Sequence, residues 1–171
     1  CNMVYHMVAQ NESMDEALKT QTFAEIRGVR AFWVYMLVDN WGNAPLATDF
    51  GSTELPSMSN RSELFNFVVT ELEEIKDQLP TNSASTYGKF TQGAAYTLLA
   101  KMYLNAEEWV GTPMYDKVVP ACDAVLAMDY ILEPDWKTNF VVNNQVSKEA
   151  ILAVPYGASA GGNNIHNRTL H

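Results

Sequence analysis

The sequence predicts a mainly α-helical fold in which antiparallel helical hairpins stack on one another, followed by a small irregular or β segment at the C-terminal end. Apolar residues recur at helical spacing through several long segments. Glycine, proline and capping residues separate these segments, and the helical period is lost after residue 128. The chain, residues 1–171, is expected to form one domain, with hairpins at about 20–79 and 91–128 and a loop and strand region at 129–171.

The first long helix is expected from about Thr20 to Val38. Its large apolar residues fall on nearly every side: Phe23, Ile26, Val29, Phe32, Trp33, Met36 and Leu37. A helix that is apolar all round is usually buried between other helices. Gly42 and Pro45 then end it in the turn NWGNAPL. The opening segment CNMVYHMV also has helical spacing and no cap, so residue 1 is expected to lie inside a helix of a longer protein.

The next helix has a clear start signal and a clear stop signal. Asn60 is placed as its N-cap, and Glu63 completes a capping box in which each side chain satisfies the other residue's backbone amide. An apolar stripe follows, made by Leu64, Val68, Leu72, Ile75 and Leu79. Pro80 ends the helix. We expect this helix to fold back on the first one as a hairpin.

The second hairpin is expected to begin with the helix TQGAAYTLLAKMYLNAEEW, capped by Thr91. The small residues of this helix from Gly93 to Ala95 allow another helix to approach closely. A helix from about Pro113 to Met128 follows, and EAILAVPYG is then expected to form a short strand. Antiparallel helix pairs in series are the style of tetratricopeptide (TPR) solenoids, although no strict period of roughly 34 residues is present.

Composition excludes several function classes. The formal net charge is −9, and phosphate binding needs the clustered Lys and Arg that this chain lacks, so nucleic acid is not an expected partner. His6, His166 and His171 show no ligand spacing with one another or with Cys1 and Cys122, so no metal site is expected. The two cysteines could form at most one disulfide, and buried or free thiols are the simpler expectation. No phosphate-binding glycine loop or nucleophile motif is present, so no cofactor and no catalytic residue is expected.

Aromatic residues beside asparagine or glycine are the candidate ligand contacts. Trp41 lies between Asn40 and Gly42, Tyr87 precedes Gly88, and Trp109 lies beside a glycine turn. An exposed aromatic ring can offer an apolar face to a sugar, while neighbouring amides bond its hydroxyls. The candidates are Asn40, Trp41, Asn43, Tyr87 and Trp109. For each aromatic taken singly, packing beneath its own loop is the alternative interpretation.

Five successive motifs resemble the SusD/RagB family in order and spacing. They are AEIRGVRAFWVYMLVDNWGNAPL, NRSELFNFVVTELEEIKDQLP, YGKFTQGAAYTLLAKMYLNAEEW, YDKVVPACDAVLAMDYIL and EAILAVPY. The resemblance covers nearly all of residues 1–157. It implies four TPR-like hairpins that carry a more irregular ligand-binding part. Members of the family are about three times longer, so the resemblance implies an internal piece of such a protein.

The resemblance also implies a function. Members are surface-exposed lipoproteins of the outer membrane of Bacteroidota-type bacteria, and they capture glycans, or sometimes peptides, without catalysis. They act as a lid on a SusC-like, TonB-dependent outer-membrane transporter. The lipidated N-terminus is not expected in this chain, and Cys1 is not expected to be the lipid-bearing cysteine. Two alternatives stay open: a TPR-like adaptor that binds a peptide on a concave surface, and an α-helical carbohydrate-active enzyme, which only the many carboxylates favour.

Overall fold

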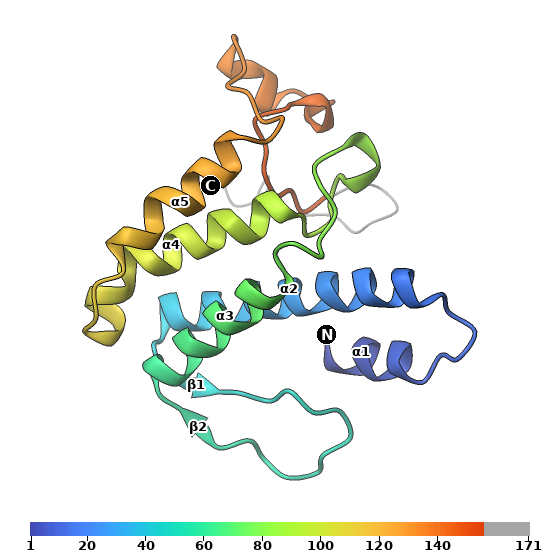
Figure 1. The fold of residues 1–171 in the computed structure, drawn as a ribbon, viewed down its shortest axis with the longest axis vertical. Coiled ribbons are helices and arrows are strands. Elements are labelled where there is room, and N and C mark those ends of the chain that lie inside the picture. Colours follow the sequence, from blue (N-terminus) through green and yellow to red (C-terminus); the bar gives the residue numbers. More distant parts are fainter. Residues whose placement is uncertain (156–171) are drawn as a thin grey trace, which may run out of the picture.

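The computed structural model describes residues 1–155 and shows a chain dominated by helices (Figure 1). The α-helices are α1 (Asn2–Ala9), α2 (Glu16–Asn40), α3 (Arg61–Ile75), α4 (Gln92–Val110) and α5 (Tyr115–Leu126). The short 3-10 helices are η1 (Ala84–Thr86), η2 (Trp136–Phe140) and η3 (Asn144–Val146). Strands β1 (Ala44–Pro45) and β2 (Met58–Ser59) pair antiparallel, with Ala44 opposite Ser59, at the base of the long loop between α2 and α3.

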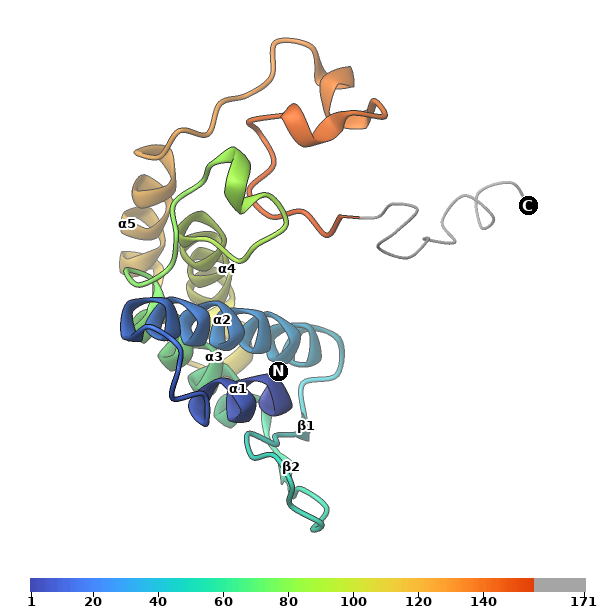
Figure 2. The ribbon, with the colours of Figure 1, turned by 90° about the vertical axis from the view of Figure 1, so that its right-hand side faces the viewer.

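Consecutive helices pack on one another: α1 on α2, α2 on α3, α3 on α4 and α4 on α5. Figure 2 shows the helices from the side, with the segment after α5 at one end of the stack. The largest fully buried side chains come from α2, α3 and α4: Val38, Leu64, Phe65, Val68, Leu72, Ile75, Leu99 and Met102. The predicted fold class, stacked helical hairpins with a small irregular or β part, is therefore confirmed.

Local signals fix where α3 begins. The Asn60 side chain accepts a hydrogen bond from Glu63 N at 2.9 Å, and the Glu63 carboxylate accepts one from Asn60 N at 2.9 Å. This is the predicted capping box. The helix ends at Ile75, a few residues before Pro80, and Leu79 is buried from the turn that follows.

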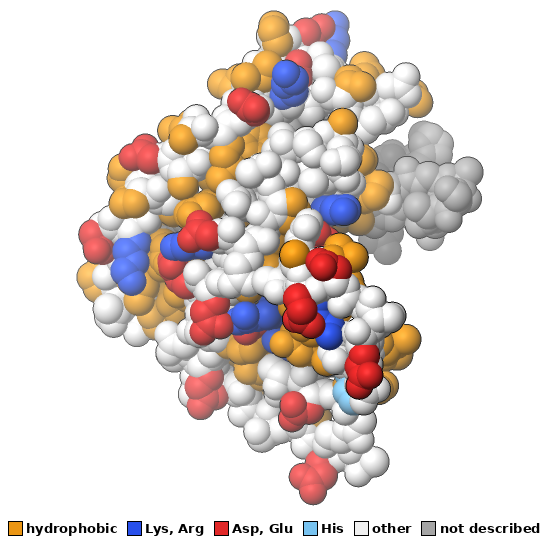
Figure 3. Space-filling model, turned by 45° about the vertical axis from the view of Figure 1, so that its right-hand side comes forward, with side chains coloured by type: hydrophobic (Ala, Val, Ile, Leu, Met, Phe, Trp, Pro, Cys, Tyr) orange, Lys and Arg blue, Asp and Glu red, His pale blue; other side chains and the backbone are white. Residues whose placement is uncertain are grey.

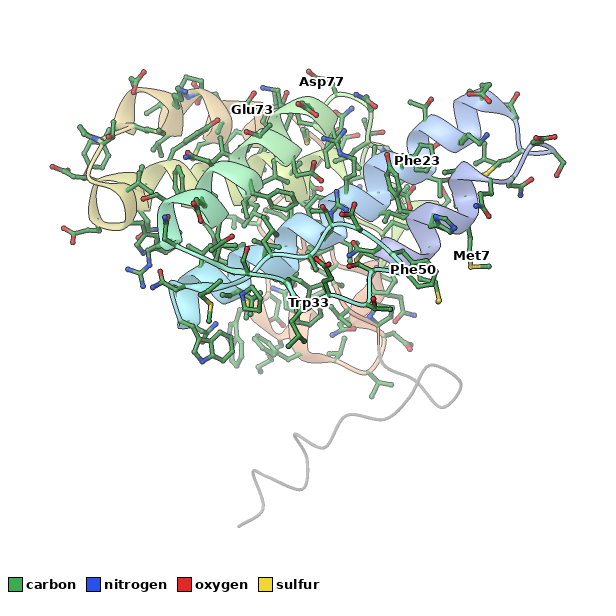
Figure 4. The ribbon with its side chains drawn as sticks, turned by 90° about the horizontal axis from the view of Figure 1, so that it is seen from below. Met7, Phe23, Trp33, Phe50, Glu73 and Asp77 are labelled. Carbon is green, nitrogen blue, oxygen red and sulfur yellow. The ribbon has the colours of Figure 1, made fainter. Side chains whose placement is uncertain are left out.

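The expectation that the helix at 20–38 is buried nearly all round is wrong. The buried positions of α2 are Ala24, Gly28, Ala31, Val34 and Val38, which are small or medium-sized. Trp33 is 60% exposed and Val29 is 37% exposed. Small residues let α2 approach its neighbours closely, whereas Phe32, Tyr35 and Leu37 are only partly buried against the core. Figure 4 labels Trp33, together with Phe23, whose ring lies 4.4 Å from the ring of Tyr5 in α1.

The second hairpin forms with two corrections. Thr91 is the N-cap residue of α4 as predicted, but its hydroxyl accepts no capping hydrogen bond. Helix α5 begins at Tyr115, two residues after the predicted start, with Met114 as its N-cap residue, and it ends at Leu126, two residues before Met128. The close approach at Gly93 is made by a loop residue: a Cβ there would lie 2.2 Å from the Tyr130 hydroxyl oxygen.

The strand expected in EAILAVPYG is not formed over its described part, which extends to Pro155. A strand needs a hydrogen-bonding neighbour, and this segment instead packs a side chain, Ile151, against the helical core. The remainder of the expected loop region, residues 156–171 with His166 and His171, lies outside the described residues.

Within residues 1–155, none of the helices combines the length and the hydropathy needed to cross a bilayer. Cys1 and Cys122 are both exposed and free, as expected. The described residues hold no cluster of three His, Cys, Asp or Glu side chains able to bind a metal ion.

Candidate functional site

The C-terminal end of α2 carries three of the five candidate residues. The Trp41 side chain is 69% exposed. Asn40 Nδ2 donates to Met36 O at 2.7 Å, and Asn43 Oδ1 accepts from Arg61 N at 3.0 Å. Each asparagine thus uses one half of its amide to hold the turn. The other half of each amide has no hydrogen-bond partner among the described residues.

Gly42 makes this turn possible. Its φ is +77°, a left-handed conformation that favours glycine. A Cβ at this position would lie 2.7 Å from Arg61 Nη2, so the turn and the first residue of α3 are packed tightly together. The backbone on both sides of Trp41 is therefore well defined.

Trp109 occupies a different environment. Its ring is partly buried, 6.3 Å from the ring of Tyr35 and 6.5 Å from that of Phe65, with the second contact edge-on. Trp109 packs against the core between α2 and α3. The ring therefore packs on the neighbouring helices and not beneath its own loop, which was the alternative interpretation.

Tyr87, by contrast, borders two adjoining hollows, which together we call the Tyr87 cleft. The first has a volume of about 300 Å³ and is lined by Tyr87, Asn139, Asn144, Ser147, Glu149, Ala150 and Ala153. The second has a volume of about 440 Å³ and is lined by Tyr87, Val142, Asn144, Gln145, Ala153, Val154 and Pro155. Figures 1 and 2 both show the loop that carries η1 beside the segment that carries η2 and η3. Tyr87 is 40% exposed, so part of its ring is open to a ligand.

Tyr87 is held by ordered residues on both sides. Thr86 is buried, and its hydroxyl accepts from Ser83 N at 2.8 Å and contacts Thr81 O at 3.1 Å. Gly88 has a φ of +79°, and a Cβ there would lie 3.0 Å from Pro155 Cγ. The loop is thereby packed against the end of the described chain.

A hydrogen-bonded polar wall faces Tyr87. Glu149 Oε2 accepts from Asn139 Nδ2 at 2.9 Å and from Glu133 N at 3.1 Å. The hydrogen bond from Asn139, and to a smaller extent that from Glu133 N, lowers the pKa of the Glu149 carboxyl below its ordinary value. Asn144 Nδ2 donates to Asn139 O at 3.2 Å. The wall is built before any ligand arrives.

Such an arrangement suits a ligand rich in hydroxyl groups. The aromatic ring offers an apolar face, and the carboxylate and amide oxygens accept hydrogen bonds. Sequence reasoning named Tyr87 as a candidate but did not name Asn139, Asn144 and Glu149, which line the same cleft. Their segment has no period, and nothing in the linear order places it against Tyr87.

The candidates do not form one site. In Figure 1 the end of α2, which leads to Trp41, lies on the opposite side of the molecule from the loop that carries Tyr87. Two separate surfaces therefore remain: the α2 end with Asn40, Trp41 and Asn43, and the Tyr87 cleft.

No protein-family model matches the chain, but curated proteins of one kind are similar to it. The starch-binding protein SusD of Bacteroides thetaiotaomicron is 29% identical over 145 residues, which are 85% of this chain and 26% of SusD. A SusD-like protein of Bacteroides ovatus is 27% identical over 157 residues, covering 84% of this chain and 28% of that protein. This chain therefore spans about a quarter of the length of both.

Solved structures share the fold. Surface glycan-binding protein A from Bacteroides uniformis has a TM-score of 0.80 at 22% identity, over 92% of this chain and 35% of that one. Surface glycan-binding protein A from Bacteroides thetaiotaomicron, solved in complex with laminarihexaose, has a TM-score of 0.74 at 23% identity, over 89% of this chain and 32% of that one. At these identities the likeness establishes the architecture.

Proposed function

Because the chain belongs to the SusD family, we propose that it takes part in capturing glycans without transforming them chemically, and that the Tyr87 cleft is where this chain contacts the sugar. The observation that carries the proposal is the pairing of a partly exposed ring with a preformed wall of carboxylate and amide oxygens. The named functions of the relatives, starch binding and glycan binding, support it.

The remaining candidates take second place. Trp41, with Asn40 and Asn43, is proposed as a separate ligand contact because its ring is open to solvent. Trp109 is the weakest candidate, since its ring already packs against Tyr35 and Phe65.

Glycan binding by the full chain tests the cleft. We expect Tyr87→Ala to weaken binding of an oligosaccharide about tenfold, which corresponds to about 1.4 kcal/mol. Isothermal titration calorimetry against soluble oligosaccharides measures it. Tyr115→Ala is the matched control, because Tyr115 is a 51% exposed tyrosine at the start of α5, outside the cleft. Equal affinities of the two variants would contradict the assignment of Tyr87. If Trp41→Ala abolishes oligosaccharide binding and Tyr87→Ala does not, the ligand site lies at the α2 end.

Capture at the outer surface of the bacterial outer membrane, followed by delivery to a SusC-like, TonB-dependent transporter, is the cellular part of the proposal. It follows from family membership. We expect the full-length protein, isolated from its native outer membrane with a mild detergent, to bring such a transporter with it, as identified by mass spectrometry. Recovery without any transporter, while the protein still binds glycan, would reject delivery and keep capture.

A further inference from the structure

We propose that the Tyr87 cleft selects uncharged oligosaccharides of two or more sugar units and discriminates against glycans that carry carboxylate or sulfate groups. This inference rests on the proposed function and adds the substrate class. It is drawn from the charge of the lining, from the hydrogen-bonding positions that remain open in it, and from the shape of the cleft.

The lining carries negative charge and no positive charge. Among the described residues that line the two hollows, Glu149 is the one with a charged side chain, and none is Lys or Arg. A second carboxylate, that of Glu133, lies directly behind, where its Oε1 accepts from Lys148 N at 2.8 Å. Lys148 contributes its backbone there, and its side chain does not line either hollow.

An anionic sugar entering this cleft would meet the ionised Glu149 carboxylate, with no Lys or Arg among the described residues that line the two hollows. Lys101 borders a third hollow, which Glu149 also lines. The hydrogen bonds from Asn139 and from Glu133 N favour the charged form of Glu149, so protonation does not relieve the repulsion near neutral pH. Placing like charges together is an effective way to reject a wrong ligand. The overall charge of −9 acts in the same direction, and Figure 3 shows acidic side chains spread over one face of the molecule.

The hydrogen-bonding atoms of the lining that have no protein partner also favour uncharged sugars. Asn139 is already used on both sides of its amide, donating to Glu149 and accepting from the Ser147 hydroxyl. Asn144 donates one of its two Nδ2 hydrogens to Asn139 O, and its Oδ1 atom accepts no hydrogen bond from the described residues. Glu149 Oε1 accepts no hydrogen bond from the described residues, so it is open as well. Acceptors of this kind suit sugar hydroxyls, which can donate, whereas carboxylate and sulfate groups can only accept.

The shape argues for an oligomer. Both hollows are bounded by Tyr87, Asn144 and Ala153, so they adjoin along these three residues. Their volumes, about 300 and 440 Å³, each lie near the lower end of the range of roughly 300–1,000 Å³ for small-ligand sites. A ligand that fills both must extend past the Tyr87 ring. A chain of sugars does so, and a monosaccharide does not.

The test uses the full chain and a panel of oligosaccharides matched in length. Neutral members are maltohexaose, laminarihexaose and cellohexaose; a matched pair is hexagalacturonate and its methyl ester, which differ in charge on one backbone. We expect the tightest binding from a neutral hexaose, at least tenfold weaker binding of its monosaccharide, and at least tenfold weaker binding of hexagalacturonate than of the best neutral member. An acidic member that binds as tightly as any neutral one would overturn the charge selection and leave glycan capture standing. A monosaccharide that binds as tightly as the hexaose would overturn the two-hollow arrangement.

Failure to bind any oligosaccharide would reject the proposed function itself, which separates the two outcomes. Glu149→Gln then locates the charge effect: the ratio of neutral to acidic affinity should fall several-fold. Glu12→Gln is the control, because it removes the same charge from an exposed residue between α1 and α2. If Glu149→Gln and Glu12→Gln show the same ratio of neutral to acidic oligosaccharide affinity, Glu149 does not cause the selectivity. If Glu149→Gln does not fold, raised ionic strength applied to the unaltered chain should lower the ratio, and an unchanged ratio would refute the electrostatic cause.

Discussion

The ion-pair cluster between α2 and α3 allows a quantitative test of what holds the first hairpin together. Glu71 of α3 accepts hydrogen bonds from two arginines of α2: its Oε1 from Arg27 Nη2 at 2.9 Å, and its Oε2 from Arg30 Nη2 at 2.8 Å. Glu71 is only 9% exposed, and Arg30 Nε is buried without a hydrogen-bond partner among the described residues. Arg27 has a second carboxylate partner in Glu74.

Replacing Glu71 by glutamine keeps the shape of the side chain and removes its charge. Arg30 then has no carboxylate partner among the described residues, and its guanidinium carbon lies 5.9 Å from the centre of the Tyr5 ring and 5.5 Å from that of Phe67. Removing one member of a buried pair costs about 3–5 kcal/mol. The arginine side chains are 14–20% exposed, and glutamine retains an acceptor oxygen, so the lower end, about 3 kcal/mol, is expected.

Urea unfolding followed by circular dichroism measures the free energy of unfolding. Glu74→Gln is the matched control, because Glu74 contacts the same arginine but is 57% exposed, and its loss should cost less than about 1 kcal/mol. Adding Arg30→Met to Glu71→Gln should restore part of the lost stability, since the unpaired buried cation is removed. If Glu71→Gln costs no more than Glu74→Gln, the cluster does not hold the hairpin.

Two further predictions concern pH and packing. Burial raises the pKa of Glu71, but hydrogen bonds from Arg27 and Arg30 outweigh it and lower the pKa below 4.5. The stability that Glu71 contributes is therefore present above about pH 4.5 and is lost as the pH falls through the folded-state pKa. The difference in unfolding free energy between the wild type and Glu71→Gln should then shrink only in acid. If the difference in unfolding free energy between the two proteins already falls between pH 7 and 6, a group other than Glu71 causes the pH dependence. Gly28→Ala should destabilise by about 1–3 kcal/mol despite the better helix propensity of alanine, because its Cβ would lie 2.3 Å from the buried Phe90 ring. Phe90→Leu in the same chain should recover part of that loss in thermal unfolding, and additive losses would contradict the steric cause.

Short-range signals were sufficient for the individual helices. Asn60 and Glu63 lie three residues apart, so their capping box needs no distant partner, and the sequence shows it directly. The stripe through Leu72 likewise predicted which side of α3 is buried. The sequence placed the start of the last helix at about Pro113, whereas α5 begins at Tyr115 with Met114 as its N-cap residue.

The amino-acid order by itself determined where the long helices lie and the capping box of α3, because these depend on residues within a few turns of one another. It also carried the kinship, through motifs in a fixed order. Only the tertiary structure decided which side of α2 is buried, since apolar residues surround that helix and the choice fell to the small ones, such as Gly28 against Phe90. The same is true of the Tyr87 cleft: its ring and its polar wall come from segments far apart in the chain, and their meeting depends on how the whole stack packs.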